Sequence, residues 1–263
     1  MSNQRRRRHR TTPPPPDADA ATKRKREKKQ IEAFPLRIPA MLRLGVDGLR
    51  REPTALLLGA VLPFVGTIPF QILAAVAFDD DRTPAAITFT LTAMVLGGAL
   101  AYPWCHYALA AARQEPVDLA APFRDWVRFV PMLVASFWFW AGMLLAFQFQ
   151  ILGGLPALAI VMAYAFFGFV VDDRHDLGGL KALGTSVRIG DGRRFALLAL
   201  AGLYAAIGVL VFMIAAAIVV SAGLTGAPAS VVVAVLLLPL VAFSLVSWAA
   251  LYDVLRKDLP DAW

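Results

Sequence analysis

The stretch DDRHDLGGLKALGTSVRIGDGRR, Asp172 to Arg194, decides how the fold of this chain is interpreted. It is a polar segment between two long apolar segments. The apolar segment on each side is long enough to cross a bilayer. The pattern therefore predicts a polytopic membrane protein with little mass outside the lipid.

Apolar residues are unusually frequent over the whole chain. Of 263 residues, 58% are hydrophobic and 17% are charged, whereas soluble proteins have roughly 45–50% and about 25%. A spanning helix needs about 20 largely apolar residues, because lipid offers no hydrogen-bond partner to the backbone. We therefore predict an all-α fold of six transmembrane helices with amphipathic interfacial helices, in a domain of residues 36–257. The predicted spans are residues 54–78, 84–111, 127–152, 155–171, 195–224 and 229–255.

The formal net charge of +7 is concentrated near the N-terminus. Residues 1–30 carry two basic runs and four consecutive prolines, with few apolar side chains to offset the entropy of ordering, so we expect a disordered tail. Two roles stay open: a solvated tail that enforces orientation, or contact with anionic phospholipid headgroups at about 1 kcal/mol per basic residue. No aromatic residues are interleaved to stack on bases, so nucleic acid is not expected as a partner. The candidate lipid-contacting residues are Arg5, Arg6, Arg7, Arg8, Lys23, Arg24, Lys25 and Arg26.

Basic residues are unevenly distributed between the two ends of the predicted spans. The connections after the first, third and fifth spans, residues 79–83, 153–154 and 225–228, hold a single basic residue, Arg82. Cytoplasmic loops carry the excess of Lys and Arg in membrane proteins. Both termini are therefore expected in the cytoplasm.

Three amphipathic stretches each precede a pair of spans, at residues 36–51, 117–128 and 176–189. We expect such helices to lie at the cytoplasmic surface of the membrane. The three units share topology but little sequence, so both a true duplication and a coincidence of architecture stay open. The apolar face predicted for the first stretch consists of Ile38, Met41, Leu42, Val46 and Leu49.

The first span contains Pro63, Gly66 and Pro69 close to its middle. Each proline removes a backbone donor and kinks a helix. A helix broken at the midplane exposes backbone to substrate in many transporters. The alternative is a simple kink that packs against neighbouring helices.

Polar residues within the spans are few. No Asp, Glu, Lys or Arg lies in the core of a predicted span, which argues against ion coupling by buried carboxylates and against a two-carboxylate hydrolase. Gln71, Gln148 and Gln150 lie toward the outer half and are candidates to line a cavity, as is His106. The other interpretation of His106 is structural, bonded to a neighbouring helix or to headgroups. The remaining polar side chains are expected to hydrogen-bond between helices; they include Thr67, Thr88, Thr90, Thr92, Ser136, Ser244 and Ser247.

Charges crowd the exit of the fourth span. Asp172, Asp173, Arg174, His175 and Asp176 follow one another directly. They are either a solvated cluster at the interface or a docking site for a cytoplasmic protein or a phospholipid headgroup. With three histidines and one cysteine in the chain, a metal site is not expected.

Two stretches resemble a diffuse group of bacterial six-helix integral membrane proteins, which includes the membrane domain fused to some glycerophosphodiester phosphodiesterases. The first is YPWCHYALAAARQEPVDLAAPFRDWVRF, residues 102–129, with a late proline, a Tyr-x-x-Leu helix end and an aromatic entry to the next span. The second is VVDDRHDLGGLKALGTSVRIGDGRRFALL, residues 170–198. The resemblance implies a fold and a bacterial inner-membrane location, and it implies no activity.

The function expected from these features is that of a non-enzymatic integral membrane protein that organises a membrane-protein partner or a lipid. The alternative is a permease or channel-like carrier of a small or lipidic solute, and an enzyme is the third hypothesis. No catalytic residue and no cofactor are expected.

Overall fold

A computed structural model of the chain describes residues 38–148, 154–225 and 227–257. Within these ranges the protein is helical and contains no strand, which confirms the all-α fold. The helices are α2 (Ile38–Arg51), α3 (Pro53–Asp79), α4 (Thr83–Leu100), α5 (Tyr102–Arg113), α6 (Ala121–Arg124), the 3-10 helix η1 (Trp126–Arg128), α7 (Phe129–Phe147), α8 (Leu155–Ala163), α9 (Phe167–Asp173), α10 (Gly179–Ile189), α11 (Arg194–Ser221) and α12 (Ala227–Lys257).

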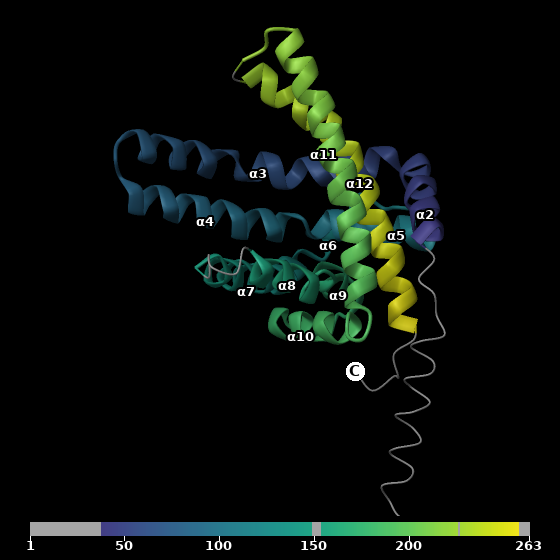
Figure 1. Cartoon of the computed structure of the whole chain (residues 1–263). Coiled ribbons are helices and arrows are strands. Elements are labelled where there is room, and N and C mark those ends of the chain that lie inside the picture. Colours follow the sequence, from purple (N-terminus) through teal and green to yellow (C-terminus); the bar gives the residue numbers. More distant parts are fainter. Residues whose placement is uncertain (1–37, 149–153, 226, 258–263) are drawn as a thin grey trace, which may run out of the picture. The chain divides into compact units, whose positions relative to one another are not determined.

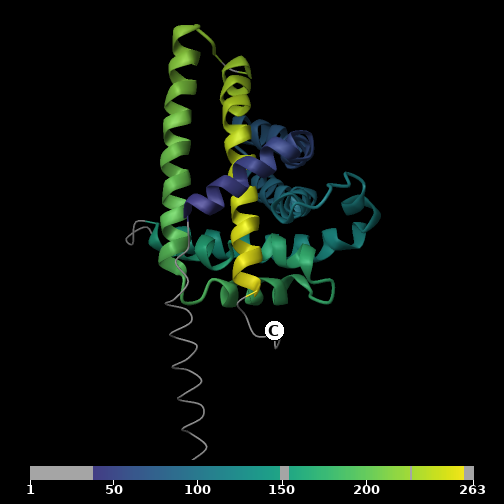
Figure 2. The same cartoon turned by 90° about the vertical axis from the view of Figure 1, so that its right-hand side faces the viewer.

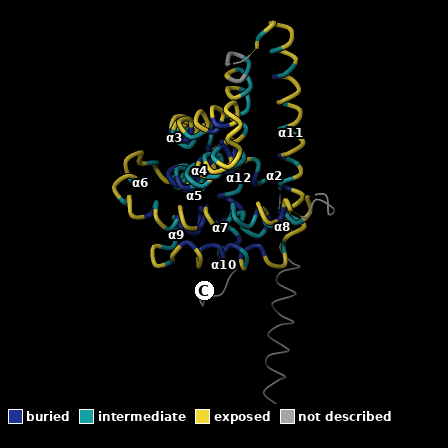
Figure 3. Tube along the Cα trace, turned by 90° about the vertical axis from the view of Figure 1, so that its left-hand side faces the viewer, coloured by how far each residue is buried: buried dark blue, intermediate teal, exposed yellow. Residues whose placement is uncertain are grey.

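Six helical stretches of the described residues are long and apolar enough to cross a membrane, as predicted. Three of them combine two elements each: α4 with α5, η1 with α7, and α8 with α9. Large apolar side chains are exposed along most spans. Figure 3 shows that exposed positions are frequent along α11. Such surfaces are stable in contact with lipid, since hydrocarbon tails cover them at no cost in hydration.

The fourth span is interrupted at Tyr164–Phe166, between α8 and α9. Ser186 of α10 repairs the interruption: its Oγ accepts a hydrogen bond from the Phe166 N–H at 3.1 Å and donates to the Ala163 carbonyl at 3.1 Å. Lipid cannot satisfy these backbone groups, so a side chain from another helix must do so. The α8–α9 span and α10 are thus folded as one unit.

The first span does not break where the sequence suggested. Helix α3 runs from Pro53 to Asp79 without interruption, although Pro63 and Pro69 lie inside it. The predicted helix break at Pro63, Gly66 and Pro69 is therefore absent. Gly66 instead allows α4 to approach, because a Cβ at this position would overlap the Leu100 side chain. Figure 1 shows α3 and α4 as a hairpin joined by a short turn.

Helix α2 packs against α12 and α5 through small residues. Its buried positions are Met41, Gly45 and Gly48, whereas Val46 of the predicted apolar face is 37% exposed. A Cβ at Gly45 would overlap Ser247 of α12. The side of α2 that faces α12 is therefore the one with glycines, because small residues allow two helix backbones to approach closely.

Helices α11 and α12 lie side by side, as Figure 2 shows. The rings of Tyr204 and Phe243 pack edge to face between them, with centroids 5.5 Å apart. Helix α12 also contacts α2, α3 and α5. The end of α12 that is predicted to face the cytoplasm, from Tyr252 to Lys257, bonds to Asp173 of α9 and to Arg113 of α5.

Candidate functional site

A cavity of about 580 Å³ lies where α3, α4 and α7 meet. The residues that line it come from the middle of each candidate span. Most of its wall is apolar, as in small-molecule sites of this size, with a few polar groups interspersed. The lining residues are Pro63, Phe64, Thr67, Gln71, Ala74, Thr90, Ala93, Met94, Gly97, Gly98, Ser136, Phe139, Trp140 and Phe167.

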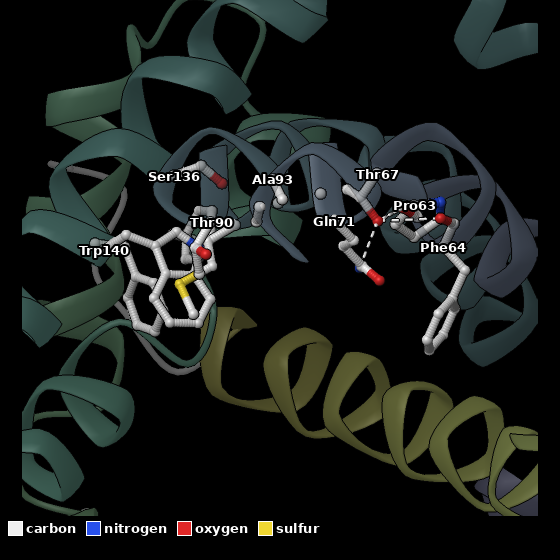
Figure 4. A pocket seen from close by; sticks show the side chains of 14 residues that line it. Pro63, Phe64, Thr67, Gln71, Thr90, Ala93, Ser136 and Trp140 are labelled. Atoms are coloured by element: carbon white, nitrogen blue, oxygen red, sulfur yellow. Dashed lines mark hydrogen bonds between the residues drawn. The ribbon is translucent and has the colours of Figure 1, made fainter. Parts of the chain in front are cut away.

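Helix α3 contributes a short chain of hydrogen bonds to the cavity wall (Figure 4). The Thr67 hydroxyl donates to the carbonyl of Pro63 at 2.8 Å and lies 3.0 Å from that of Phe64. Gln71 donates from Nε2 to Thr67 Oγ1 at 3.2 Å, so its side-chain carbonyl oxygen is left to accept another bond. The amide is therefore held in place with its acceptor available to a ligand.

Helix α7 contributes the Ser136 hydroxyl, which is in an unusual state. Ser136 is 1% exposed, and its Oγ has no hydrogen-bond partner among the described residues. Gly98 of α4 creates the space for this hydroxyl, because a Cβ there would overlap it. A buried hydroxyl without a partner costs about 1–3 kcal/mol, and binding of a polar group in the cavity would recover this cost.

Aromatic side chains close the cavity on the α7 side. Phe139 stacks on Phe167 with ring centroids 5.8 Å apart and packs edge to face with Trp140 at 5.3 Å. Flat rigid rings give an extensive apolar wall with little entropy to lose on binding. The arrangement suits a lipophilic molecule that carries one or two hydrogen-bonding groups.

The structure treats the four predicted cavity residues differently. Gln71 lines the cavity, whereas Gln148 is exposed at the end of α7, and Gln150 lies outside the described residues. His106 is not part of the cavity wall: its Nδ1 bonds Asp172 Oδ1 at 2.9 Å. Its structural interpretation, a bond to another helix, is the one that the geometry shows.

The Thr and Ser hydroxyls that were expected to form hydrogen bonds between helices mostly form them within their own helix. Thr88, Thr90 and Thr92 each donate to the carbonyl four residues earlier. The same local bond is made by Thr67 and Ser247. Because the i−4 carbonyl is always within reach on a helix, this local partner competes with any partner on a neighbouring helix.

A network of charged side chains joins three helices at the end of the domain where α5, α9 and α12 meet. Arg113 of α5 donates to Asp173 of α9 at 2.8 Å and to Asp253 of α12 at 3.0 Å. Asp173 also accepts bonds from Tyr252 at 3.0 Å and from Arg256 at 2.6 Å. We call these five residues the end network. Only Asp173 was predicted as a site residue from the sequence, because the partners in this network lie far apart along the chain.

The predicted docking cluster divides into two parts. Asp172 and Asp173 are turned inward, toward His106 and the end network, with 9% and 8% of their side chains exposed. Arg174 donates twice to Asp176, at 2.9 Å for both bonds, and this pairing lowers the pKa of Asp176 to about 2. The two inward carboxylates are engaged by partners within the chain, and residues 174–176 form the more accessible part.

No group of three or more His, Cys, Asp or Glu side chains that could hold a metal ion occurs in the part of the chain that the structure describes. The basic residues of the N-terminal tail lie outside that part. Comparisons with models of protein families, with curated proteins and with solved structures found no match to this chain. The resemblance to bacterial six-helix membrane proteins therefore stays a prediction.

Proposed function

We propose that this protein is a non-enzymatic membrane protein that binds a lipid, or another lipophilic molecule of similar size, inside the bilayer. The observation that carries the proposal is the cavity between α3, α4 and α7, with the unpartnered Ser136 hydroxyl in its wall. An apolar wall recognises hydrocarbon, and the Ser136 hydroxyl and the Gln71 carbonyl offer one donor and one acceptor. A lipid hydroxyl can use both, because it accepts from Ser136 and donates to Gln71, whereas an ester can only accept from Ser136.

The cellular setting is part of the same proposal. The distribution of basic residues supports a cytoplasmic location for both termini, and the resemblance supports a bacterial inner membrane. In that setting the N-terminal basic runs would act at the anionic cytoplasmic leaflet. The cavity would hold the lipid, and the tail would keep the protein oriented at the cytoplasmic surface of the membrane.

Native mass spectrometry tests the proposal on the full-length chain released from lipid nanodiscs. The wild-type protein is expected to retain a lipid mass in this cavity. Thr90→Phe, which places a ring in the cavity, is expected to lose it. Thr88→Phe is the matched control, because Thr88 lies on the same helix, makes the same local bond and is absent from the cavity wall. Equal retention by both variants would refute cavity binding. Co-purification of a second protein at fixed stoichiometry would instead favour a protein that organises a membrane-protein partner.

The second candidate function is a carrier for such a molecule. It is favoured by the interruption at Tyr164–Phe166, since discontinuous spans are typical of transporters. Flux of a fluorescent lipid analogue across proteoliposomes distinguishes the two. A carrier is expected to give a flux that Gln71→Ala and Pro63→Ala reduce, whereas a static lipid binder is expected to give no flux above that of protein-free vesicles.

A further inference from the structure

A second cavity, of about 340 Å³, lies at the entry to the third span. It shares no lining residue with the intramembrane cavity, so a ligand bound here is independent of the proposed function. Its wall comes from η1, the start of α7 and the loop that leads into α10. The lining residues are Asp125, Val127, Arg128, Pro131, His175, Asp176, Leu177 and Gly178.

Arg128 is the central group of this second cavity. The residue is 5% exposed, and its guanidinium lies among the wall residues. Nε donates to His175 Nδ1 at 3.2 Å and lies 3.4 Å from Asp125 Oδ2, while Nη1 donates to the carbonyl of Arg174 at 3.4 Å. Nη2 has no hydrogen-bond partner in the described ranges. A buried cationic donor without a partner is costly, and an anionic oxygen is the partner that suits it.

The start of α10 adds further donors beside Arg128. The helix begins at Gly179, and its N-cap, Gly178, lines the cavity and supplies no side-chain capping bond. The first N–H groups of a helix have no partner within the helix and carry its positive dipole end. Gly178 brings the start of this helix to the same cavity wall as Arg128, and an arginine beside a helix N-terminus suits phosphate oxygens.

Two carboxylates also line the second cavity. Asp176 accepts two bonds from Arg174 at 2.9 Å. Asp125, whose side chain is 45% exposed, has longer ion pairs through Oδ2, at 3.4 Å with Arg128 and 3.5 Å with His175, so Asp125 is the carboxylate more available to a ligand. A simple anion would be repelled by Asp125. A ligand that carries both a phosphate and an ammonium group satisfies both signs of charge.

The position of the second cavity favours a lipid as the source of this ligand. Trp126 and Val127 of η1 are 66% and 57% exposed, and they open the third span. Exposed tryptophan at the end of a span is typical of the level of the lipid headgroups. The cavity therefore lies where phosphates and amines of the membrane surface are concentrated.

We propose that this second cavity binds the headgroup of a zwitterionic phospholipid with a primary ammonium, that is, a phosphoethanolamine headgroup. The phosphate accepts from Arg128 Nη2 and from the first N–H groups of α10, and the ammonium donates to Asp125. A trimethylammonium headgroup has no N–H to donate. The site therefore discriminates by hydrogen bonding as well as by charge.

The test uses the full-length protein in detergent, titrated with phosphatidylethanolamine, phosphatidylcholine or phosphatidylglycerol of the same acyl chains, and native mass spectrometry as the readout. Phosphatidylethanolamine is expected to bind at least tenfold more tightly than either other lipid, the factor that one charge-assisted hydrogen bond supplies. Equal binding of the three lipids would overturn the proposal. Free phosphoethanolamine is expected not to displace the lipid, and displacement at matched concentration would assign the site to a soluble compound.

Two variants test the assigned roles. Asp125→Asn is expected to abolish the preference for phosphatidylethanolamine over phosphatidylcholine, and Arg128→Gln is expected to weaken all three lipids. Asp125 is partly exposed, so its variant is expected to fold even where Arg128→Gln is not. The control is Asp191→Asn, a change of the same type at a carboxylate that is 78% exposed and lies outside the cavity. An unchanged preference in Asp125→Asn would refute the ammonium contact.

Discussion

Removal of the Asp173 carboxylate is the most direct test of how the helices are held together. This side chain is 8% exposed and accepts bonds from Arg113, Tyr252 and Arg256. Asp173→Ala leaves the half-buried guanidinium of Arg113 and the buried phenol of Tyr252 with fewer partners. Loss of one member of a buried ion pair costs about 3–5 kcal/mol.

The lower end of that range applies here. The Arg256 side chain is 34% exposed, so solvent screens part of its interaction, and Arg113 keeps its bond to Asp253. We therefore expect Asp173→Ala to reduce the free energy of unfolding by about 3 kcal/mol. Asp191→Ala is the control, because Asp191 is highly exposed and its ion pair with Arg194 is long, at 3.8 Å. Its expected effect is below about 0.5 kcal/mol.

The assay is reversible unfolding of the purified protein in mixed micelles, titrated with sodium dodecyl sulfate and followed by tryptophan fluorescence. A double-mutant cycle between Asp173→Ala and Arg113→Ala isolates the direct bond, for which a coupling energy of about 1–3 kcal/mol is expected. An effect of Asp173→Ala below about 1 kcal/mol, or no larger than that of Asp191→Ala, would refute the reasoning. The end network would then not be what joins α9 to α5 and α12.

Topology, helix approach and the interrupted span can each be tested by single substitutions. A cysteine placed at Thr225, in a variant free of the natural cysteine, is expected to react with a membrane-impermeant maleimide from outside; protection there would contradict the six-span topology. Gly45→Ala is expected to cost about 1–3 kcal/mol because its methyl group overlaps side chains of α12. Gly184→Ala, with nothing within 4 Å of the new Cβ, is expected to gain up to about 1 kcal/mol, and equal effects of the two would argue against the close α2–α12 contact. Ser186→Ala is expected to cost about 1–3 kcal/mol and to speed hydrogen exchange at the Phe166 amide; unchanged exchange would mean that this bond is not what protects the amide.

The sequence alone was enough for the class of fold and for the spans. Bilayer thickness sets the length of an apolar helix, and backbone groups in lipid must bond within the helix, so composition over a window of about 20 residues decides the outcome. The predicted 54–78 span became a helix at Pro53–Asp79, and the predicted 195–224 span became one at Arg194–Ser221. These are local properties of the chain.

The site needed the tertiary structure. Gln71 was a candidate from its position in a span, but the state of the Ser136 hydroxyl depends on Gly98, which belongs to a different helix. In the sequence, Arg128 is only the last residue of the amphipathic stretch 117–128, and its burial beside His175 is what gives it a further role. In each case the decisive neighbour lies on another element of the structure, and no local sequence pattern shows that the two residues will be in contact.

The same reason explains where the helices break. Pro63 and Pro69 carried a strong local signal, yet α3 continues through both, whereas the fourth span is interrupted at residues that include no proline. The sequence by itself determined that six helices are long and apolar enough to cross a membrane, because that depends only on length and composition. Only the tertiary structure decided that Ser186 satisfies the broken backbone near Phe166, because a hydrogen bond across 20 residues of sequence exists only once the helices have packed.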